Sequence, residues 1–258
     1  MKQSQFYYLL RRGLFSAGSA IIKNGLVMFN KFTTAGLNFP AQGSAEFNGT
    51  SDFITTPRPL DGTLSDYTIS FWMNASTGTA VAFGTDGDTT NYALAYKNAS
   101  TMRWEVRGTF SSPTSFTLSS SVNPWTNEWI YCTIRVESNN GAFYFNGSKD
   151  TTAFAGPLNF SSDFIIGGYG GGALKLDGNL ANVAIWNRAL TSDEINSVMW
   201  KSYEGLTGAE SNGLQAWYSL DDITSPAASL ANMEQLATDK DATIENKAAI
   251  TAAINALS

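Results

Sequence analysis

The stretch LDGNLANVAIWNRALTSDEINSVMW (Leu176–Trp200) decides the fold of this chain. Its first half is an apolar, partly β-branched run, which predicts a half-buried strand over Gly178–Trp186. The chain must then turn, because Thr191 has the character of a helix N-cap and Glu194 follows three residues later to complete a capping box. The stretch therefore predicts a core strand followed at once by a short, well-capped helix.

The composition indicates a globular chain with a sizeable core. The 258 residues suffice for one large all-β domain or two small ones, and 43% of them are apolar. Charged residues make up 15%, against a typical value of about 25%, so Ser, Thr, Asn and Gly must cover much of the surface. Such surfaces are common on extracellular and virion proteins. A net charge of −6 without a broad basic patch argues against nucleic-acid binding.

Two residue types exclude whole classes of chemistry. The single cysteine, Cys132, cannot form an intrachain disulfide, and its apolar surroundings (WIYCTIRV) predict a buried free thiol. The chain has no histidine, which removes the commonest general base and the commonest transition-metal ligand. Stability must therefore come from packing, and catalysis would need other groups.

The first 24 residues form a basic, aromatic arm ahead of an acidic body. Arg11 and Arg12 interrupt what would otherwise be an apolar run, so the segment predicts neither a signal peptide nor a membrane span. Phe6, Tyr7 and Tyr8 precede the two arginines, and this combination favours docking against another protein, with binding at a membrane surface as the alternative.

Between Gly25 and about Asn187, short apolar runs alternate with clusters of turn residues, as is typical of an antiparallel β protein. The expected strands are Leu26–Phe32, Ala45–Phe47, Asp52–Thr55, Tyr67–Met73, Thr79–Phe83, Tyr92–Tyr96, Met102–Val106, Ser115–Leu118, Glu128–Glu137, Gly141–Phe145, Phe164–Gly167 and Gly178–Trp186. So many strands tend to split into two packed sheets, which predicts a sandwich. Asn140-Gly141, Asn146-Gly147 and Asp177-Gly178 are suited to tight hairpin turns.

The chain changes character after the predicted helix. Gln215–Leu220 reads as a late strand that rejoins the sandwich, and from Ser229 onward apolar residues recur near helical spacing. We therefore expect an arm over residues 1–24, a sandwich domain over 25–204 and an extension of one strand plus helices over 205–258. The apolar face of the expected C-terminal helices must be buried, either on the chain's own body or against a neighbouring subunit.

An ordered set of segments carries a family resemblance. The segments are GLVMFNKF, AEFNGTSDFI, YTISFWMN, NEWIYCTIRVESNNGAFYFNGS, FIIGG and finally LDGNLANVAIWNRALTSDEI. In this order they resemble a laminin-G-like jelly roll of the concanavalin A-like superfamily, over Gly25 to about Met199. The resemblance implies an all-β fold of two antiparallel sheets. It also implies binding of glycans or proteins through loops at one edge, in many members with a calcium ion.

The calcium site implied by the resemblance has weak support in this sequence. Family members commonly read I-D-E-V where this chain has Leu180-Ala181-Asn182-Val183, so the acidic positions are replaced. Asp86 and Asp88 in the DGDTTN loop are the candidate oxygen ligands that remain, and a solvated turn is the competing interpretation.

Candidate ligand-binding residues come from aromatic side chains beside polar stretches. Tyr92, Tyr96, Trp104 and Trp125 could present exposed rings to a glycan, although each could equally pack within the sheets. Related enzymes hydrolyse polysaccharides with an E-x-D-x-x-E strand, and this chain lacks that spacing.

These observations favour a non-enzymatic structural or adhesive protein of a bacteriophage virion, such as a capsid decoration, head-fibre or tail-fibre component. Its expected partners are other virion proteins, further copies of itself or a host-surface glycan. The alternative is a stand-alone carbohydrate-binding lectin, with or without dependence on calcium. A third hypothesis, a degenerate glycosidase, would rely on Glu105 or Glu128.

Overall fold

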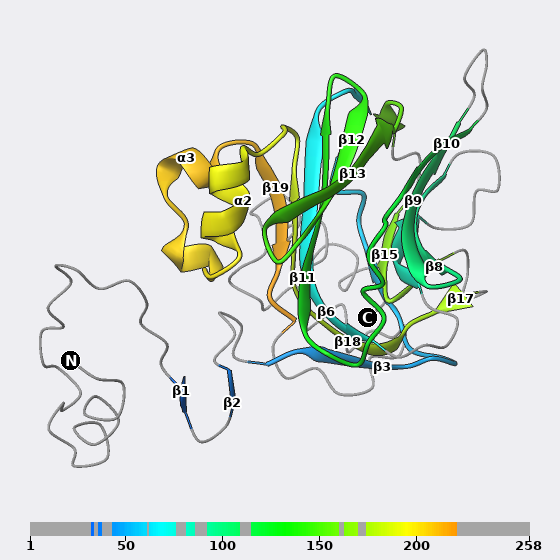
Figure 1. Ribbon diagram of the computed structural model, residues 1–258, viewed down its shortest axis with the longest axis vertical. Coiled ribbons are helices and arrows are strands. Elements are labelled where there is room, and N and C mark those ends of the chain that lie inside the picture. Colours follow the sequence, from blue (N-terminus) through cyan, green and yellow to red (C-terminus); the bar gives the residue numbers. More distant parts are fainter. Residues whose placement is uncertain are drawn as a thin grey trace, which may run out of the picture. The chain divides into compact units, whose positions relative to one another are not determined.

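The computed structural model describes residues 32–33, 36–37, 43–60, 62–75, 81–85, 92–108, 115–159, 163–169 and 174–220. The chain divides into two units, residues 1–38 and 39–258. In the first unit β1 (Phe32–Thr33) pairs with β2 (Gly36–Leu37) as a short antiparallel ladder. The other elements lie in the second unit, whose two main sheets face each other (Figure 1).

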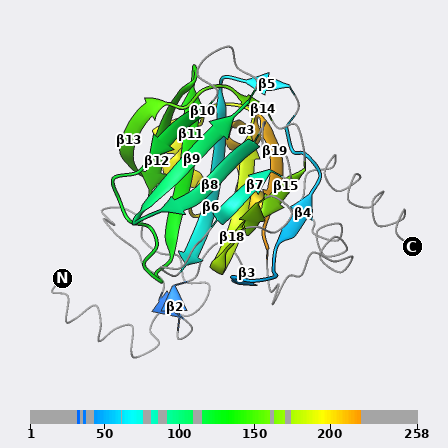
Figure 2. The ribbon, with the colours of Figure 1, turned by 90° about the vertical axis from the view of Figure 1, so that its right-hand side faces the viewer.

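One sheet has six antiparallel strands, and Figure 2 looks onto its outer face. Across the sheet the order is β10 (Ser115–Ser119), β9 (Thr101–Arg107), β8 (Tyr92–Asn98), β7 (Val81–Thr85), β15 (Phe164–Ile166) and β4 (Ile54–Thr56). Two short ladders accompany the sheets: β5 (Thr63–Leu64) with β14 (Leu158–Asn159), and β16 (Gly168–Tyr169) with β17 (Leu174–Lys175).

The second sheet has seven strands, centred on β6 and β18. Its order is β13 (Ser148–Phe154), β12 (Asn140–Phe145), β11 (Ile130–Glu137), β6 (Tyr67–Ala75), β18 (Asp177–Trp186) and β19 (Leu214–Tyr218), and β3 (Ala45–Asn48) also pairs with β18. The long strand β18 thus binds β3 with its first half and β19 with its second half. The expected late strand therefore does rejoin the sandwich.

The core lies between the two sheets and is rich in aromatic side chains. Phe71 of β6 meets Phe83 of β7 edge to face, with ring centroids 5.1 Å apart, and Phe83 also packs against Phe164. Cys132 is fully buried among these residues, and burial raises the pKa of its thiol. The predicted all-β sandwich and the buried free thiol are both confirmed.

The predicted junction after β18 forms as expected. Thr191 caps α2 (Ser192–Val198): its hydroxyl accepts from the Glu194 N–H, and the Glu194 carboxylate accepts from the Thr191 N–H. Leu190 and Ile195, on either side of the cap, are fully buried. The sequence signal for this strand–helix junction is therefore confirmed in detail.

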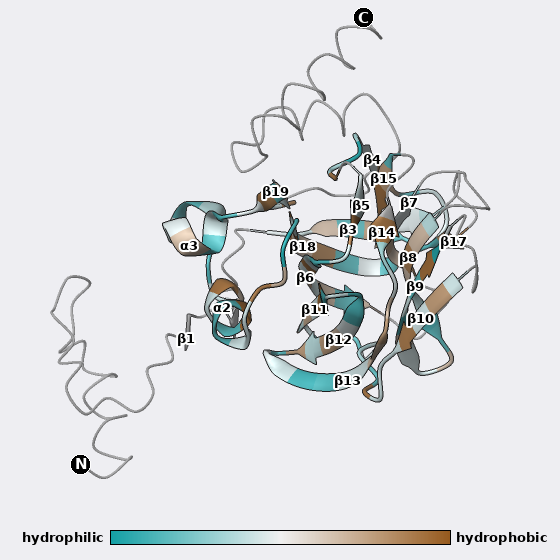
Figure 3. Ribbon diagram, turned by 90° about the horizontal axis from the view of Figure 1, so that it is seen from above, coloured by the Kyte–Doolittle hydropathy of each residue, from teal (hydrophilic) through white to brown (hydrophobic). Residues whose placement is uncertain are grey.

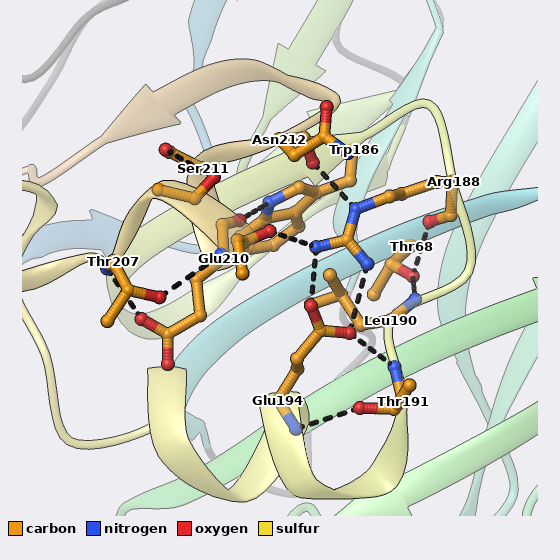
Figure 4. Close-up of polar contacts among 12 residues, drawn as sticks. Thr68, Trp186, Arg188, Leu190, Thr191, Glu194, Thr207, Glu210, Ser211 and Asn212 are labelled. Atoms are coloured by element: carbon orange, nitrogen blue, oxygen red, sulfur yellow. Dashed lines mark hydrogen bonds and ion pairs between the residues drawn. The ribbon is translucent and has the colours of Figure 1, made fainter.

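A second capping box follows, which the sequence analysis did not identify. After η2 (Tyr203–Gly205), Thr207 and Glu210 cap α3 (Gly208–Ser211) in the same reciprocal way, and Lys201 binds the Glu210 carboxylate at 2.6 Å. Figure 4 shows this pair of caps together with Trp186, whose indole N–H donates to the Glu210 carbonyl at 2.8 Å. The two caps hold the helical segment against the outer face of the seven-stranded sheet (Figure 1).

The sequence prediction missed the four short strands β5, β14, β16 and β17, and the expected strand over Leu26–Phe32 (except Phe32) and the expected C-terminal helices lie outside the described residues. Other local features also differ from the prediction. Strand β13 was missed because its residues, SKDTTAF, are mostly exposed and hydrophilic, as the teal colour in Figure 3 shows. The turn that joins β11 to β12 lies at Ser138-Asn139, where both residues have positive φ, and not at Asn140-Gly141. Gly178 lies within β18, where it approaches the neighbouring strand closely, and not in a hairpin turn. The Asn146-Gly147 turn is confirmed, with φ of 49° and 78°.

The cap of α2 yields a first testable prediction. Replacing Thr191 with alanine removes the oxygen that accepts from the Glu194 N–H, and should lower the free energy of unfolding by about 1 kcal/mol. Thr191→Ser keeps that oxygen and should restore most of the loss. Urea unfolding followed by circular dichroism checks both variants. Equal stability of the alanine variant and the parent protein would contradict the role of the cap.

None of the helices in the described part of the chain has the length and apolar character needed to span a bilayer.

Candidate functional site

Strand alternation brings Tyr92 and Tyr96 together on the outer face of the six-stranded sheet. Ala93 and Ala95 of β8 point into the core, so the two tyrosines, at the alternate positions, point outward. Both are partly exposed. They stand four residues apart, which corresponds to about 13 Å along the strand. We call the outer face around these residues the tyrosine face.

A carboxylate from the next strand links the two tyrosines. Glu105 of β9 accepts a hydrogen bond from the Tyr92 hydroxyl at 2.7 Å and from the Tyr96 hydroxyl at 2.9 Å. The register places Glu105 opposite Leu94, midway between the two tyrosines, so one carboxylate reaches both. The two rings are therefore held in place before any ligand arrives.

Arginines flank this carboxylate on both sides. Arg103 pairs with Tyr96 and Arg107 with Tyr92 across the β8–β9 ladder. The Arg103 guanidinium carbon lies 5.9 Å from the centre of the Tyr96 ring, and one of its N–H groups donates to the Tyr96 hydroxyl at 3.2 Å. Arg107 lies 6.0 Å from the Tyr92 ring. The face thus alternates phenol, carboxylate and guanidinium groups.

The β16–β17 ladder supplies a third tyrosine. Tyr169 meets Tyr92 edge to face, with ring centroids 5.5 Å apart. Its position depends on Gly84, where a Cβ atom would lie 2.9 Å from the Tyr169 ring and 3.0 Å from the Leu94 side chain. Glycine at this point of β7 therefore lets Tyr169 lie close to the sheet beside Tyr92.

The surroundings keep the phenols protonated. Partial burial, reinforced by the hydrogen bond to and the charge of Glu105, raises the pKa of Tyr92 to about 12. Burial also raises the pKa of Tyr96; Glu105 adds to this increase, while Arg103 opposes it. At neutral pH both tyrosines therefore act as donors to Glu105, and the carboxylate keeps lone pairs that can accept from a ligand.

The arrangement suits a polyhydroxylated ligand. Tyrosine rings offer flat apolar surfaces, while the guanidinium groups donate and the carboxylate accepts hydrogen bonds. Among the described strand residues of this face, Glu105 is the one acidic side chain. Glycoside hydrolysis by either common mechanism needs two carboxyl groups at a fixed separation. The described strands of this face do not supply that pair.

The other two predicted ligand residues are corrected by the structure. Trp104 and Trp125 are completely buried, so neither can present a ring to a glycan. Trp104 alternates with Arg103 and Glu105, points into the core, and donates its indole N–H to the Tyr67 hydroxyl at 2.9 Å. Trp125 fills the core from the loop before β11 and donates to the Thr101 carbonyl at 3.1 Å.

The remaining predicted site residues lie outside the described ranges. These are the possible calcium ligands Asp86 and Asp88 and the possible docking residues Phe6, Tyr7, Tyr8, Arg11 and Arg12. In the described ranges no three acidic, histidine or cysteine side chains gather as a metal site would require. At the replaced acidic positions, Asn182 is buried and its side-chain nitrogen has no hydrogen-bond partner. An asparagine offers calcium only its neutral amide oxygen, which is a weaker ligand than the carboxylate that it replaces.

The carboxylates of the glycosidase hypothesis are spread over the molecule. Glu105 lies on β9 of the six-stranded sheet, whereas Glu128 precedes β11 of the other sheet and is exposed. Glu137, at the far end of β11, pairs with Arg135 at 2.8 Å. Glu105 and Glu128 therefore lie on different sheets.

Sequence reasoning missed Glu105, Arg103, Arg107 and Tyr169 as members of the site. A signal for the first three was present, because Arg103, Glu105 and Arg107 alternate with apolar residues in RWEVRG and must share one face. Tyr169 gave no local signal, since it reaches Tyr92 from a ladder more than seventy residues later in the chain.

Comparison with known proteins agrees with this fold. Residues 48–196 match a laminin-G family model described as the concanavalin A-like lectin/glucanases superfamily. Comparison with curated protein sequences gives no match. A proposed carbohydrate binding protein from Bacteroides ovatus is similar in structure, with a TM-score of 0.53 and 17% identity over 72% of this chain. This chain spans 53% of that protein.

Two further solved structures are more distant. A sialidase carbohydrate-binding module from Ruminococcus gnavus, solved with α2,3-sialyllactose, has a TM-score of 0.46 and 13% identity, covering 62% of this chain and 99% of its own. A pentraxin from Limulus polyphemus has a TM-score of 0.43 and 17% identity, covering 64% of this chain and 82% of its own.

Proposed function

This chain belongs to the concanavalin A-like lectin/glucanase superfamily, and from this premise we propose that it is a non-enzymatic glycan-binding module that recognises its ligand on the tyrosine face. One observation carries the proposal: Glu105 holds Tyr92 and Tyr96 in fixed positions on an outward sheet face. Rings that are already ordered lose less entropy when a ligand binds, which favours affinity.

Each kind of side chain on the tyrosine face would make a different contact with the glycan. Tyr92 and Tyr96 would pack against the apolar faces of sugar rings. Arg103 and Arg107 would donate to hydroxyl or carboxylate oxygens, and Glu105 would accept from hydroxyl groups. The Glu105 carboxylate already accepts hydrogen bonds from both tyrosines, and no second acidic group lies on the described strands of this face. The proposed role of the site is therefore binding and not hydrolysis.

The finer role that we propose is display on a bacteriophage virion, as a capsid decoration, head-fibre or tail-fibre component. The low charged fraction of 15% and the basic arm ahead of an acidic body support it. In this arrangement residues 1–24 and the part of the chain that follows β19 contact other virion proteins or further copies of the chain, and the sandwich, which includes β19, faces outward to a host-surface glycan. Incorporation into particles of a chain lacking residues 1–24 tests the docking role, and full incorporation would refute it.

Binding of the full chain to a glycan array tests the recognition itself. Replacing both Tyr92 and Tyr96 with alanine removes two ring contacts and should weaken binding by at least about tenfold, because a loss of about 1.4 kcal/mol has that effect. Phe154→Ala, which removes an exposed ring on β13, is the matched control and should bind like the parent protein. Unchanged array signals for the double variant would exclude the tyrosine face.

The same array separates the proposal from the stand-alone calcium-dependent lectin. Binding through the tyrosine face needs no metal ion, so signals should persist in EDTA. Signals that vanish in EDTA and return with calcium would favour the lectin and direct attention to Asp86 and Asp88.

A further inference from the structure

The outer face of the seven-stranded sheet carries an exposed tryptophan. Trp200 is the most exposed large apolar side chain among the described residues, with 59% of its surface open to solvent. It follows α2, where its backbone N–H donates to the Ser197 carbonyl at 3.4 Å. An exposed indole of this size offers a flat apolar surface on which a ligand can pack.

Trp200 rests on a rigid aromatic base. Its ring centroid lies 5.6 Å from that of Trp72, which packs on Tyr131 at 5.3 Å. Trp72 is buried and fixed by its indole N–H, which donates to the Met199 carbonyl at 3.2 Å. The exposed ring is therefore supported from beneath by residues that keep their places without a ligand, which lowers the entropic cost of stacking on it.

A row of polar side chains crosses three strands of the same face. Trp72 belongs to the outer cluster under the helices, so alternation along β6 places Asn74 on the outer face as well. The register pairs Asn179 of β18 with Asn74 on one side and with Glu46 of β3 on the other. Side chains that are paired in this way stand about 5 Å apart. Two amides and a carboxylate therefore form a line that begins two residues from Trp72.

The row is open to a ligand. Asn74 and Asn179 are partly exposed and Glu46 is exposed. The Asn179 amide donates to the Ser44 hydroxyl at 3.3 Å, which orients it. In Figure 1 α2 and α3 cover one end of this face, while β3 lies at the other. The polar row thus ends on β3, which α2 and α3 do not cover.

We propose that Trp200 and this polar row form a second glycan-binding site for a neutral glycan, in which one hexopyranose ring packs on Trp200 and a further ring reaches along the row. A pyranose has an apolar C–H face that packs on an indole, and its hydroxyl groups both donate and accept, as amides and a carboxylate require. Glu46 and the absence of a cation among these residues disfavour an acidic sugar. The site lies on the opposite sheet from the tyrosine face, so binding at one site can be tested independently of binding at the other.

Titration of the full chain, labelled with 15N at tryptophan, tests the site directly. The probes are methyl β-D-galactopyranoside and methyl α-D-glucopyranoside, and the signal is the Trp200 indole N–H, assigned by comparison with Trp200→Phe. We expect the Trp200 signal to shift with at least one probe, with a dissociation constant on the order of 1–10 mM, as a single sugar ring allows. No shift with either probe would overturn the proposal.

Variants separate a specific site from a merely exposed ring. In the Tyr92→Ala/Tyr96→Ala background, which removes binding on the tyrosine face, saturation-transfer signals from the bound sugar should weaken at least about tenfold in Trp200→Ala and about three- to tenfold in Asn74→Leu, which removes one hydrogen-bonding amide. Trp200→Phe should retain part of the binding. The controls are Phe154→Ala and the Tyr92→Ala/Tyr96→Ala double variant, neither of which should alter the Trp200 shift. A shift that survives Asn74→Leu unchanged would show stacking without the polar row, and would refute the site as proposed.

Discussion

Replacing Trp104 with alanine should lower the free energy of unfolding by about 3–5 kcal/mol, as large-to-small changes of core aromatic residues do. The Trp104 side chain is fully buried, and its ring centroid lies 5.8 Å from that of Phe83. Its indole N–H also donates to the Tyr67 hydroxyl at 2.9 Å, and the substitution would leave that buried hydroxyl without this partner. Urea unfolding measured by circular dichroism gives the change.

Tyr96→Ala is the contrasting variant, because Tyr96 lies in the same sheet but points outward. It should cost roughly 1 kcal/mol or less in stability, since the residue is partly exposed, yet weaken glycan binding. Trp104→Ala should show the reverse, with glycan preference kept at temperatures where the variant stays folded. If Tyr96→Ala destabilised the chain more than Trp104→Ala, the inward and outward assignments of β8 and β9 would be wrong.

The features that sequence predicted best are those that local rules determine. The strand ending at Trp186 and the cap at Thr191 depend on residues a few positions apart, so the sequence contains all their partners. The same holds for most strands of the two sheets. Strand β13 escaped because it is an exposed edge strand with little apolar alternation, and only its pairing with β12 defines it.

The candidate site was predicted only in part, for a physical reason. Tyr92, Tyr96 and Trp104 all occur beside polar residues, and composition alone cannot tell which face of a strand a ring occupies. Alternation along the strand decides which face a ring occupies. Trp104 stands between Arg103 and Glu105 in β9, so its side chain must point to the opposite face of the sheet from theirs. Trp125 lies outside regular structure, where no period applies, so its burial could not be inferred.

The helical segment links the proposed Trp200 site to the stability of the sheet. Trp200 follows α2, and α2 is held in place by the capped junction at Thr191. If that junction loosened, the base under Trp200 would loosen too, because Met199 at the end of α2 holds the Trp72 indole. The tyrosine face, on the other sheet, has no such dependence. Damage to the junction should therefore impair one site and spare the other.

Arg188 holds the junction together, and Arg188→Ala should lower the free energy of unfolding by about 3 kcal/mol. Its guanidinium binds both oxygens of Glu194, at 2.9 and 2.7 Å, and donates to the carbonyls of Asn212 at 2.6 Å and Ala209 at 2.7 Å (Figure 4). One side chain thus joins β18, α2 and α3. Arg188→Lys keeps the charge but loses the planar fork, so it should recover less than half of the loss.

The contribution of Arg188 should depend on pH in a way that identifies its partner. Arg188, with the Thr191 N–H, lowers the pKa of Glu194 in the folded state, although burial opposes this. A carboxyl with a depressed folded pKa adds stability above its ordinary pKa of about 4.5, and this stability is lost as the pH falls below it. The difference in unfolding free energy between the parent protein and Arg188→Ala should therefore shrink from pH 6 to pH 3.

The neighbouring ion pair of Lys201 with Glu210 provides the comparison that makes this decisive. Burial opposes ionisation of Glu210, but its bonds to Lys201, Ser197 and Thr207 prevail and lower its pKa to about 2. Its contribution should therefore decline gradually below about pH 4.5 and disappear only below about pH 2, so Lys201→Met should still be destabilising at pH 3, although less than at pH 6. Unfolding curves at pH 6, 4 and 3 for both variants give the two profiles. An Arg188→Ala deficit as large at pH 3 as at pH 6 would mean that the carbonyl contacts, and not Glu194, carry the junction.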